Sequence, residues 1–242
     1  MDFSTLKTLI LSSRSIVYFG GAGTSTESNI PDFRSQNGLF AKGKERAVDP
    51  ETILTPSFLL EKTEEFYLFH RQFLLHPDAK PNAAHFALSE IERRGQLLGV
   101  ITQNIDGLHQ MAGSHNVIEL HGSVHKNYCL DCGKPFNVDF IIHSQGTVPR
   151  CDDCSGIIRP DVVLYGEPVN NEKIEQSKGI IEQAEVLIVG GTSLTIHPAA
   201  SLVRHFRGRL FVIINHTPTP LDGLANFILP HDVGKVLQMV VR

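Results

Sequence analysis

The chain has 242 residues, a formal net charge of −4 at pH 7, and 41% hydrophobic and 20% charged residues. These values are ordinary for a globular protein that is one large domain or a domain with a smaller insert. The slight negative charge gives no support to non-specific nucleic-acid binding, which requires an excess of Lys and Arg. No apolar run approaches the roughly 20 residues that cross a bilayer. We therefore expect neither a nucleic-acid nor a membrane partner.

The amino-terminal part of the chain predicts a helix, a strand and a glycine-rich turn. Apolar residues at helical spacing predict an amphipathic helix over 3–13. A short β-branched apolar run over 15–19 predicts a buried parallel strand. Residues 20–34 then read GGAGTSTESNIPDFR. Because glycines after a strand let backbone N–H groups approach a pyrophosphate, this segment predicts a dinucleotide site.

The glycine fingerprint alone leaves an alternative open. Its first two glycines are present, but Thr26 stands where the third belongs, and any α/β protein can contain a glycine-rich bend. That alternative does not explain why Asp32, Phe33 and Arg34 follow, a carboxylate, an aromatic ring and a guanidinium in three residues. Arg34 suits phosphate because its donors form a planar fork. The triplet favours the dinucleotide interpretation.

The rest of the chain alternates between helices and apolar strands. Glycines and prolines break residues 35–80 into short helices and loops, which predicts a helical insert with 64–75 as its clearest helix. Each later strand ends in polar or glycine-rich residues, and open parallel sheets bind ligands at such strand ends. We expect strands over 98–102, 117–120, 161–165, 186–189 and 210–214, and helices over 82–94, 171–184, 198–206 and 233–241.

All four cysteines lie between positions 129 and 154 and form two C-x-x-C pairs separated by residues 133–150. This spacing is typical of tetrahedral zinc sites, and two thiolate pairs complete the coordination of Zn²⁺, so we expect a structural metal. A redox C-x-x-C is the alternative. The clustering, with no N-terminal signal pattern, favours a reducing compartment. The linker holds only two cations, Lys134 and Arg150, which argues against nucleic-acid binding. The expected ligands are Cys129, Cys132, Cys151 and Cys154.

Together these motifs resemble the sirtuin family over essentially the whole chain. The resemblance implies an NAD-dependent protein-lysine deacylase of α/β class. Its Rossmann-like parallel sheet would be flanked by helices, and a smaller domain would consist of a zinc ribbon and a helical insert. The motifs are GAGTSTESNIPDFR at 21–34, TQNIDGLH at 102–109, HG at 121–122, the cysteine pairs, RPDVVLYGE at 159–167, GTSL at 191–194 and IIN at 213–215.

The resemblance also implies a division of the chain. Residues 1–34, 76–122 and 159–242 would form the NAD-binding domain, while 35–75 and 123–158 would form the small domain. The implied cofactors are NAD as co-substrate and one structural Zn²⁺. The implied partners are acetyl-lysine-bearing proteins bound as extended peptides, and the expected location is the cytoplasm.

Two residues are expected to act in catalysis. His121 ends a predicted strand beside a glycine, and an imidazole that titrates near neutrality suits a general base. In sirtuins the corresponding histidine activates a ribose hydroxyl after the acyl oxygen has displaced nicotinamide. Asn104 offers an uncharged hydrogen bond beside a cationic transition state. The alternatives are a hydrogen-bonded core histidine and a polar turn that caps a strand.

The expected NAD contacts surround these two residues. Asp106 can accept a hydrogen bond from the nicotinamide carboxamide, and Ile105 can pack on its ring. Phe33 would shield the reactive C1′ from water, and Asp32 would orient the loop or the ribose. The resemblance assigns the remaining NAD contacts to Ala22, Thr26, Arg34, Gln103, Thr192, Ser193, Asn215 and Val233.

Two segments resemble the edges between which sirtuins hold an extended peptide. Pairing through the peptide backbone ignores side chains, so it predicts loose substrate selectivity. The expected peptide contacts are Val163, Gly166, Glu167, Thr195, Ile196 and His197.

Three residues depart from the family pattern. Asn29 replaces a glycine, and asparagine tolerates the positive φ that the turn requires. Thr24 replaces an isoleucine, which is expected to alter packing against the nicotinamide pocket. Tyr165 replaces a phenylalanine, a mild change.

The acyl preference can be narrowed from the helix over 64–75. Sirtuins that favour succinyl or malonyl groups carry a Tyr there and an Arg three residues on. Here Tyr67 is followed by His70, with Arg71 one position later. One residue turns a helical side chain by about 100°, so carboxylate capture is disfavoured and acetyl or another uncharged acyl group is expected. A protonated His70 would take over part of that role.

Several functions remain open from sequence. The leading one is deacylation, which yields nicotinamide and O-acetyl-ADP-ribose. Mono-ADP-ribosyl transfer at the same site needs the same NAD contacts but another acceptor. A non-catalytic NAD-sensing zinc-ribbon module is the third, and a hydride-transferring dehydrogenase ranks below these.

Overall fold

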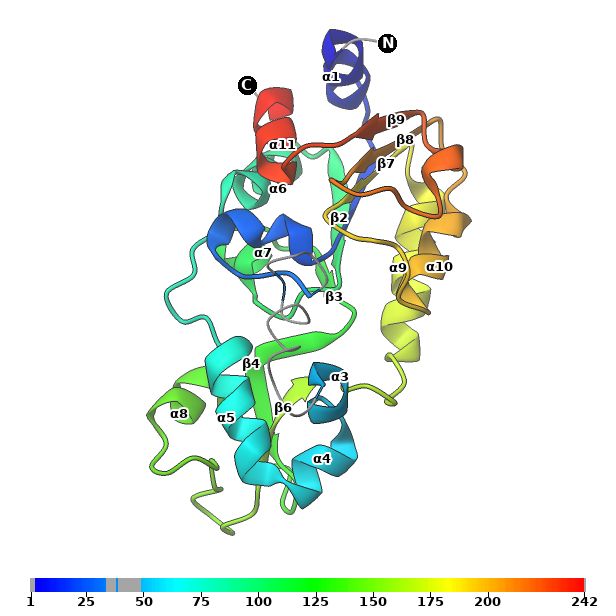
Figure 1. The fold of residues 1–242 in the computed structure, drawn as a ribbon. Coiled ribbons are helices and arrows are strands. Elements are labelled where there is room, and N and C mark those ends of the chain that lie inside the picture. The colour runs from blue at the N-terminus through cyan, green and yellow to red at the C-terminus, as the bar shows by residue number, and fades with distance from the viewer. Residues whose placement is uncertain (1–2, 34–37, 39–48, 242) are drawn as a thin grey trace.

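A six-stranded parallel sheet organises the protein (Figure 1). The computed structural model describes residues 3–33, 38 and 49–241. The sheet has the order β3-β2-β1-β7-β8-β9, with β1 and β7 at its centre. The strands are β1 (Ile16–Gly20), β2 (Leu97–Thr102), β3 (Val117–Glu119), β7 (Val186–Gly190), β8 (Leu210–Ile214) and β9 (Phe227–Leu229).

Helices cover both faces of this sheet because the strands are apolar on both sides. Along β1, Ile16 and Tyr18 join one buried cluster and Val17 and Phe19 join the other, as the period of two in a strand requires. Helices α1, α6 and α11 contribute to the first cluster, and α9 and α10 to the second. Their bounds are α1 (Phe3–Leu11), α6 (Ala83–Arg93), α9 (Asn171–Gln183), α10 (Ala199–Leu202) and α11 (Val233–Val241).

The strand order changes direction between β1 and β7. The chain places β2 on one side of β1 and β7 on the other, so the loops that leave their carboxyl ends diverge. Gly20 pairs with both Thr102 of β2 and Gly190 of β7 at this edge. Such a switch point is where open α/β sheets bind ligands.

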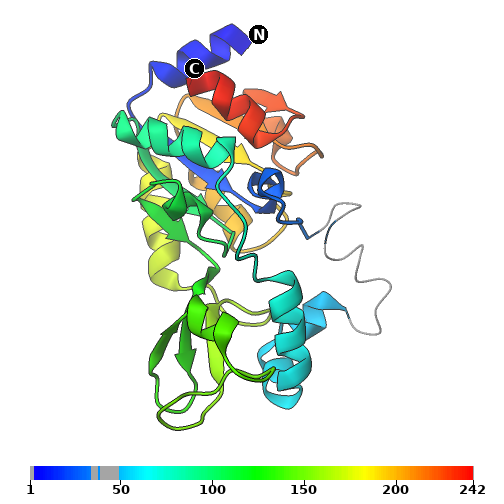
Figure 2. The ribbon, with the colours of Figure 1, turned by 90° about the vertical axis from the view of Figure 1, so that its left-hand side faces the viewer.

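A smaller lobe of the structure, which we call the lower lobe, lies below the parallel sheet (Figure 2). Three antiparallel strands have the order β5-β4-β6 and lie beside helices α3, α4, α5 and α8. Phe66, Ile141 and Ile158 belong to one buried cluster, so the helical and cysteine-bearing segments share a core. The bounds are α3 (Pro50–Ile53), α4 (Pro56–Glu61), α5 (Thr63–Phe73), β4 (Gly122–Cys129), β5 (Pro135–Asn137), α8 (Val138–His143) and β6 (Ile158–Val162).

The prediction of a parallel strand over 161–165 is wrong. The strand is β6, it begins at Ile158, and it pairs antiparallel with β4. Its apolar pattern indicated a strand, but periodicity does not say which sheet a strand joins. The three-residue β9 and the elements β4, β5 and α8 were not predicted. The other predicted strands and the helices over 3–13, 64–75, 82–94, 171–184 and 233–241 are confirmed within two residues at each end.

The remaining elements are short. The predicted helix over 198–206 is α10 followed by a 3₁₀ turn, η3. Among the described residues, no helix is long and apolar enough to cross a membrane. These short elements are η1 (Ala22–Thr24), η2 (Thr26–Ser28), α7 (Leu108–Met111), η3 (Val203–His205) and η4 (Asp222–Leu224).

Candidate active site

A cleft of about 960 Å³ opens at the carboxyl edge of the parallel sheet. Its walls come from the glycine segment, the ends of β2, β7 and β8, and the loop after β6. Of the residues expected to bind NAD or act in catalysis, these line it: Ala22, Thr26, Asp32, Phe33, Gln103, Asn104, Ile105, Asp106, His121, Thr192, Ser193, Asn215 and Val233. Arg34 lies outside the described residues.

The two glycines of the fingerprint allow the turn to pack tightly against the end of β7. Gly21 N–H donates to the Gly190 carbonyl at 3.1 Å, and Gly23 N–H donates to the Gly191 carbonyl at 2.8 Å. A Cβ at position 23 would lie 2.7 Å from Gly191 Cα, and one at position 21 would lie 2.7 Å from Thr192 Cβ. The glycines therefore lock the loop onto its neighbour and so fix the floor of the cleft.

The structure shows the surroundings of two residues that depart from the family pattern, Asn29 and Thr24. Asn29 has φ 63°, which confirms that it occupies the left-handed turn. Thr24 does not itself line the cleft, and its effect on packing against the nicotinamide pocket stays a prediction. Its side chain is buried, and the Thr24 and Tyr18 hydroxyl oxygens are 2.7 Å apart. A buried hydroxyl needs a hydrogen-bond partner, and Thr24 finds one in Tyr18, so its side chain points to the core instead of the pocket.

His121 lies on the cleft wall with its ring held from one side. Its Nδ1 is 3.0 Å from the Gln103 carbonyl oxygen, which accepts only if Nδ1 carries the proton. The neutral ring then presents an unprotonated Nε2. Burial lowers the pKa of His121 and nearby Lys173 lowers it further, while the bond to Gln103 acts in the opposite direction. His121 is therefore set up to accept a proton at Nε2.

Ser25 joins the polar side chains at the end of β2, and sequence reasoning missed it. Its hydroxyl donates to Asp106 Oδ2 at 2.7 Å and accepts from Asn104 Nδ2 at 3.0 Å. Asp106 Oδ1 accepts from Leu108 N–H at 3.0 Å. This network fixes both Asn104 and Asp106. A lone serine in a Gly-Thr-Ser run carries no spacing signal, and only its place in the quoted motif could have pointed to it.

Five of the six expected peptide contacts line the cleft. On one wall lie Val163, Gly166 and Glu167, and on another lie Ile196 and His197. Thr195 is not among the lining residues, and its hydroxyl is 2.8 Å from Ser193 Oγ.

The side chains considered for capture of an acidic acyl group lie away from the cleft. Tyr67 is buried and donates to the Ile158 carbonyl. Burial lowers the pKa of His70 to about 3, so it stays neutral at pH 7 and does not take over the cationic role. Arg71 donates to Ser144 Oγ at 2.8 Å and to the Ile142 carbonyl at 3.3 Å. None of the three lines the cleft.

The four cysteines converge on one point. Their Sγ atoms all lie within 4.8 Å of one another. Cys129 and Cys154 Sγ are 3.4 Å apart and Cys132 and Cys151 Sγ are 3.7 Å apart. A tetrahedron with Zn–S bonds of about 2.3 Å has sulfurs about 3.8 Å apart, so the four thiols fit one zinc ion. Both short contacts join one pair to the other, which argues against a redox C-x-x-C.

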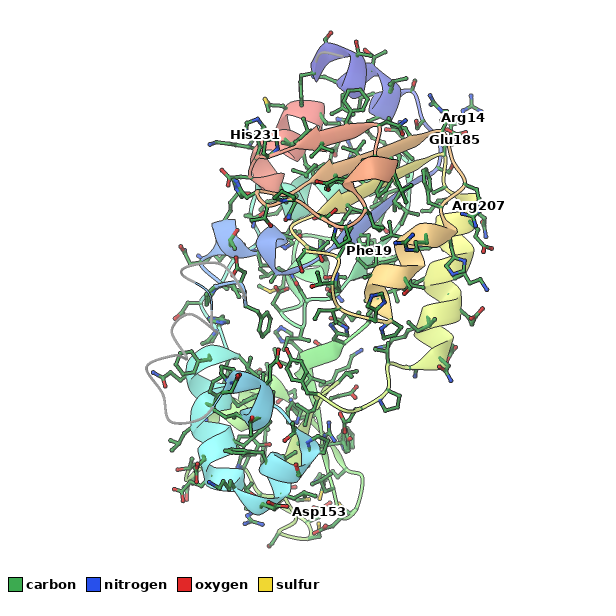
Figure 3. The ribbon with its side chains drawn as sticks, turned by 45° about the vertical axis from the view of Figure 1, so that its right-hand side comes forward. Arg14, Phe19, Asp153, Glu185, Arg207 and His231 are labelled. Atoms are coloured by element: carbon green, nitrogen blue, oxygen red, sulfur yellow. The ribbon has the colours of Figure 1, made fainter. Side chains whose placement is uncertain are left out.

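The metal cluster is remote from the cleft. None of the four cysteines lines it, and Figure 3 places Asp153, between the second pair, at the far tip of the lower lobe. Lys134 bridges Asp152 and Asp153 at 2.7 and 2.9 Å there. Four thiolates leave a tetrahedral ion no open position, so the metal would be structural.

The fold and site define an α/β protein with a parallel sheet, a cleft at its switch point and a four-cysteine metal ribbon. The model of the Sir2 family matches residues 21–198, and the chain belongs to this family. A relative from Clostridium acetobutylicum named NAD-dependent protein deacetylase is 51% identical over 98% of this chain and 96% of its own. A relative of the same name from Staphylococcus aureus is 43% identical over 99% and 98%.

Solved structures agree with this assignment. A structure described as Sir2 bound to acetylated peptide has a TM-score of 0.85 at 37% identity and covers 99% of this chain and 97% of that one. A complex described as Sir2-p53 peptide-NAD+ has a TM-score of 0.86 at 39% identity with the same coverage.

Proposed function

We propose that this protein is an NAD-dependent protein deacetylase that removes acetyl groups from lysine side chains and releases nicotinamide and O-acetyl-ADP-ribose. The observation that carries the proposal is His121, held by Gln103 with its Nε2 available in a cleft at the sheet's switch point. The name shared by relatives 43–51% identical over nearly the whole chain supports it.

The cleft offers NAD the groups that its parts require. Gly21 and Gly23 donate their N–H groups to the end of β7, so Ala22 between them, which lines the cleft, is the residue of the glycine turn that would offer its backbone amide to the pyrophosphate. Phe33 and Ile105 provide apolar surface for the nicotinamide. Asn104 and Asp106 add polar atoms that Ser25 holds in place. The further proposed contacts are Ala22, Thr26, Asp32, Arg34, Gln103, Thr192, Ser193, Asn215 and Val233.

His121 would accept the proton of a ribose hydroxyl at Nε2. That oxygen would then bond to the carbon of the acyl group that has replaced nicotinamide on C1′, and addition of one water with loss of the lysine amine from that carbon would leave O-acetyl-ADP-ribose. Because its pKa is lowered, the ring is neutral and ready to accept a proton at neutral pH. Asn104 hydrogen-bonds without charge, so it does not compete with the developing cation.

The acetylated peptide would lie between the two walls that carry Val163 and Ile196. The binding of an acetylated peptide by a Sir2 structure 37% identical to this chain supports this placement. Contact through backbone atoms would admit many sequences. The other proposed peptide contacts are Gly166, Glu167, Thr195 and His197.

Zinc and the division of the chain complete the proposal. One Zn²⁺ on the four cysteines would hold residues 123–158, which with 35–75 form the small domain beside the NAD-binding remainder. The four free thiols that this site needs support a reducing compartment, the cytoplasm. Detection of the protein in the cytosolic fraction of fractionated cells tests the location.

The activity is tested with NAD and peptides that carry acetyl-, succinyl- or myristoyl-lysine, with products identified by mass spectrometry. We expect free lysine, nicotinamide and O-acetyl-ADP-ribose from the acetyl peptide. A preference for the succinyl peptide would contradict the placement of Arg71 outside the cleft. His121→Ala should abolish turnover.

Other products would point to the other functions. ADP-ribose stably attached to protein, without deacetylation, would indicate ADP-ribosyl transfer. Formation of NADH would indicate a dehydrogenase, and unchanged function in His121→Ala would indicate an NAD sensor.

A further inference from the structure

A buried arginine lies behind the wall of the cleft that would face the peptide. Arg159, in β6, is only 8% exposed. It donates to Glu167 Oε1 at 2.8 Å and to Glu167 Oε2 at 3.0 Å, which is the bidentate geometry of a guanidinium with a carboxylate. It also donates to the Val162 carbonyl at 3.0 Å and the Pro160 carbonyl at 3.3 Å. All four of these bonds go to the segment that follows Arg159.

Glu167 links Arg159 to the turn at residues 164–167. Its Oε2 also accepts from Leu164 N–H at 2.9 Å, while Glu167 N–H donates to the Leu164 carbonyl at 3.0 Å. Side chain and backbone therefore close residues 164–167 into a compact turn, with Gly166 at φ 91°. Arg159 and Leu164 together lower the pKa of Glu167, so the carboxylate stays ionised and continues to accept from both.

The turn is also tied to the catalytic side of the molecule. Val163 N–H donates to the His121 carbonyl at 2.9 Å, and Tyr165 N–H donates to the Leu54 carbonyl at 2.8 Å. The cleft wall at Val163 therefore lies at a fixed place relative to His121. Any shift of the turn would change the distance between a peptide on this wall and the base.

We propose that Arg159 and Glu167 are positioning residues, a clamp with a buried arginine that holds the peptide-facing edge at 163–166. Glu167 then acts on the peptide through the backbone of the turn and does not select basic side chains. This inference rests on the deacetylase function proposed above. Two observations carry it: both Glu167 oxygens are occupied, and the charge of Glu167 is balanced by Arg159.

The test uses Glu167→Gln and the double variant Arg159→Gln/Glu167→Gln, with Glu175→Gln as the control. Glu175 belongs to an exposed ion pair with Lys178 on α9. Steady-state kinetics are measured with two acetyl-lysine peptides, one with neutral and one with basic flanking residues, and the KM for NAD is measured separately. Thermal melting shows how far each variant remains folded at the assay temperature.

We expect the KM for both peptides to rise about tenfold in Glu167→Gln, since small displacements of a binding element have effects of this order. The KM for NAD should change less than twofold. The double variant should be no worse than the single one, because the two residues act as a unit. If Glu167→Gln does not fold, Arg159→Lys, which keeps the charge but loses the bidentate pair, should raise the peptide KM in the same way.

Three results would overturn the clamp while leaving the deacetylase function intact. The first is an unchanged peptide KM, and the second is a loss confined to the basic peptide, which would show direct contact. The third is an equal rise in the KM for NAD and for peptide. A wild-type protein without deacetylase activity would instead refute the proposed function, and the clamp with it.

Discussion

At the scale of single residues, the environment of His121 decides its chemistry. The Gln103 carbonyl fixes the tautomer, and Lys173 stands close enough to disfavour a second positive charge. Lys173 is itself held, because its Nζ donates to the Glu119 carbonyl at 2.7 Å. Gln103 therefore positions the base, while burial, the Gln103 bond and Lys173 together set its pKa.

Replacing Lys173 with Met should move the acid limb of the pH profile. The positive charge lowers the pKa of His121, so its removal raises that pKa and the base becomes protonated at a higher pH. We expect the acid limb of kcat/KM to shift to higher pH, measured over pH 5 to 9. Lys178→Met, on the same helix, is the matched control and should leave the limb in place. No shift in Lys173→Met would show that Lys173 does not contribute to this pKa.

Thr24 belongs to the glycine-rich segment, yet its side chain stabilises the fold. Its hydroxyl is a partner of the fully buried Tyr18 hydroxyl. Thr24→Val should destabilise the protein by about 1–3 kcal/mol, because Tyr18 loses a buried hydrogen-bond partner. The loss should be smaller in Tyr18→Phe/Thr24→Val, where neither hydroxyl remains.

The stability change of each variant is measured from its midpoint of urea unfolding. The exposed Thr8→Val serves as control and should stay within about 0.5 kcal/mol of wild type. An equal loss in the single and double variants would mean that leaving the buried Tyr18 hydroxyl unpaired costs nothing.

At the scale of elements, the two C-x-x-C pairs lie at either end of a segment with little secondary structure. Between the two pairs lie only β5 and α8, and both pack into the buried cluster shared with α5. A zinc ion bound by four thiolates stabilises such a segment directly, because the site forms only in the folded chain.

Removal of the metal should therefore unfold the lower lobe. Cys151→Ser, or treatment with a strong chelator, should lower the melting temperature and abolish activity, although no cysteine lines the cleft. Elemental analysis should find one zinc per wild-type chain. A metal-free protein with unchanged melting and activity would contradict a structural role.

The elements that the sequence predicts best are those whose pattern is decided locally. The strand over 15–19 and the helix over 233–241 appear as β1 and α11 within two residues because each shows a complete apolar pattern. The strand near 161 was placed in the wrong sheet. Its partner, β4, begins at Gly122, and such a pairing between distant residues leaves no local signal.

At the scale of the whole molecule, the site depends on which strand ends meet. Motif residues from four separate segments, around positions 22, 104, 121 and 192, line one cleft. The sequence predicted this because parallel strands share an edge for their carboxyl ends. Individual side-chain contacts could not be predicted: the partner of Thr24 is Tyr18, and Ser25 joins Asn104 to Asp106. These depend on side-chain direction, which periodicity does not give.

The central claim is that the cleft brings the His121 base to the ribose of a bound NAD. The most direct measurement is a crystal structure of the protein with NAD and an acetyl-lysine peptide. The account predicts that His121 Nε2 lies within hydrogen-bond reach, about 3 Å, of a ribose hydroxyl, with its Nδ1 still on the Gln103 carbonyl. A ribose bound elsewhere, with the imidazole turned toward packed aliphatic side chains, would contradict it.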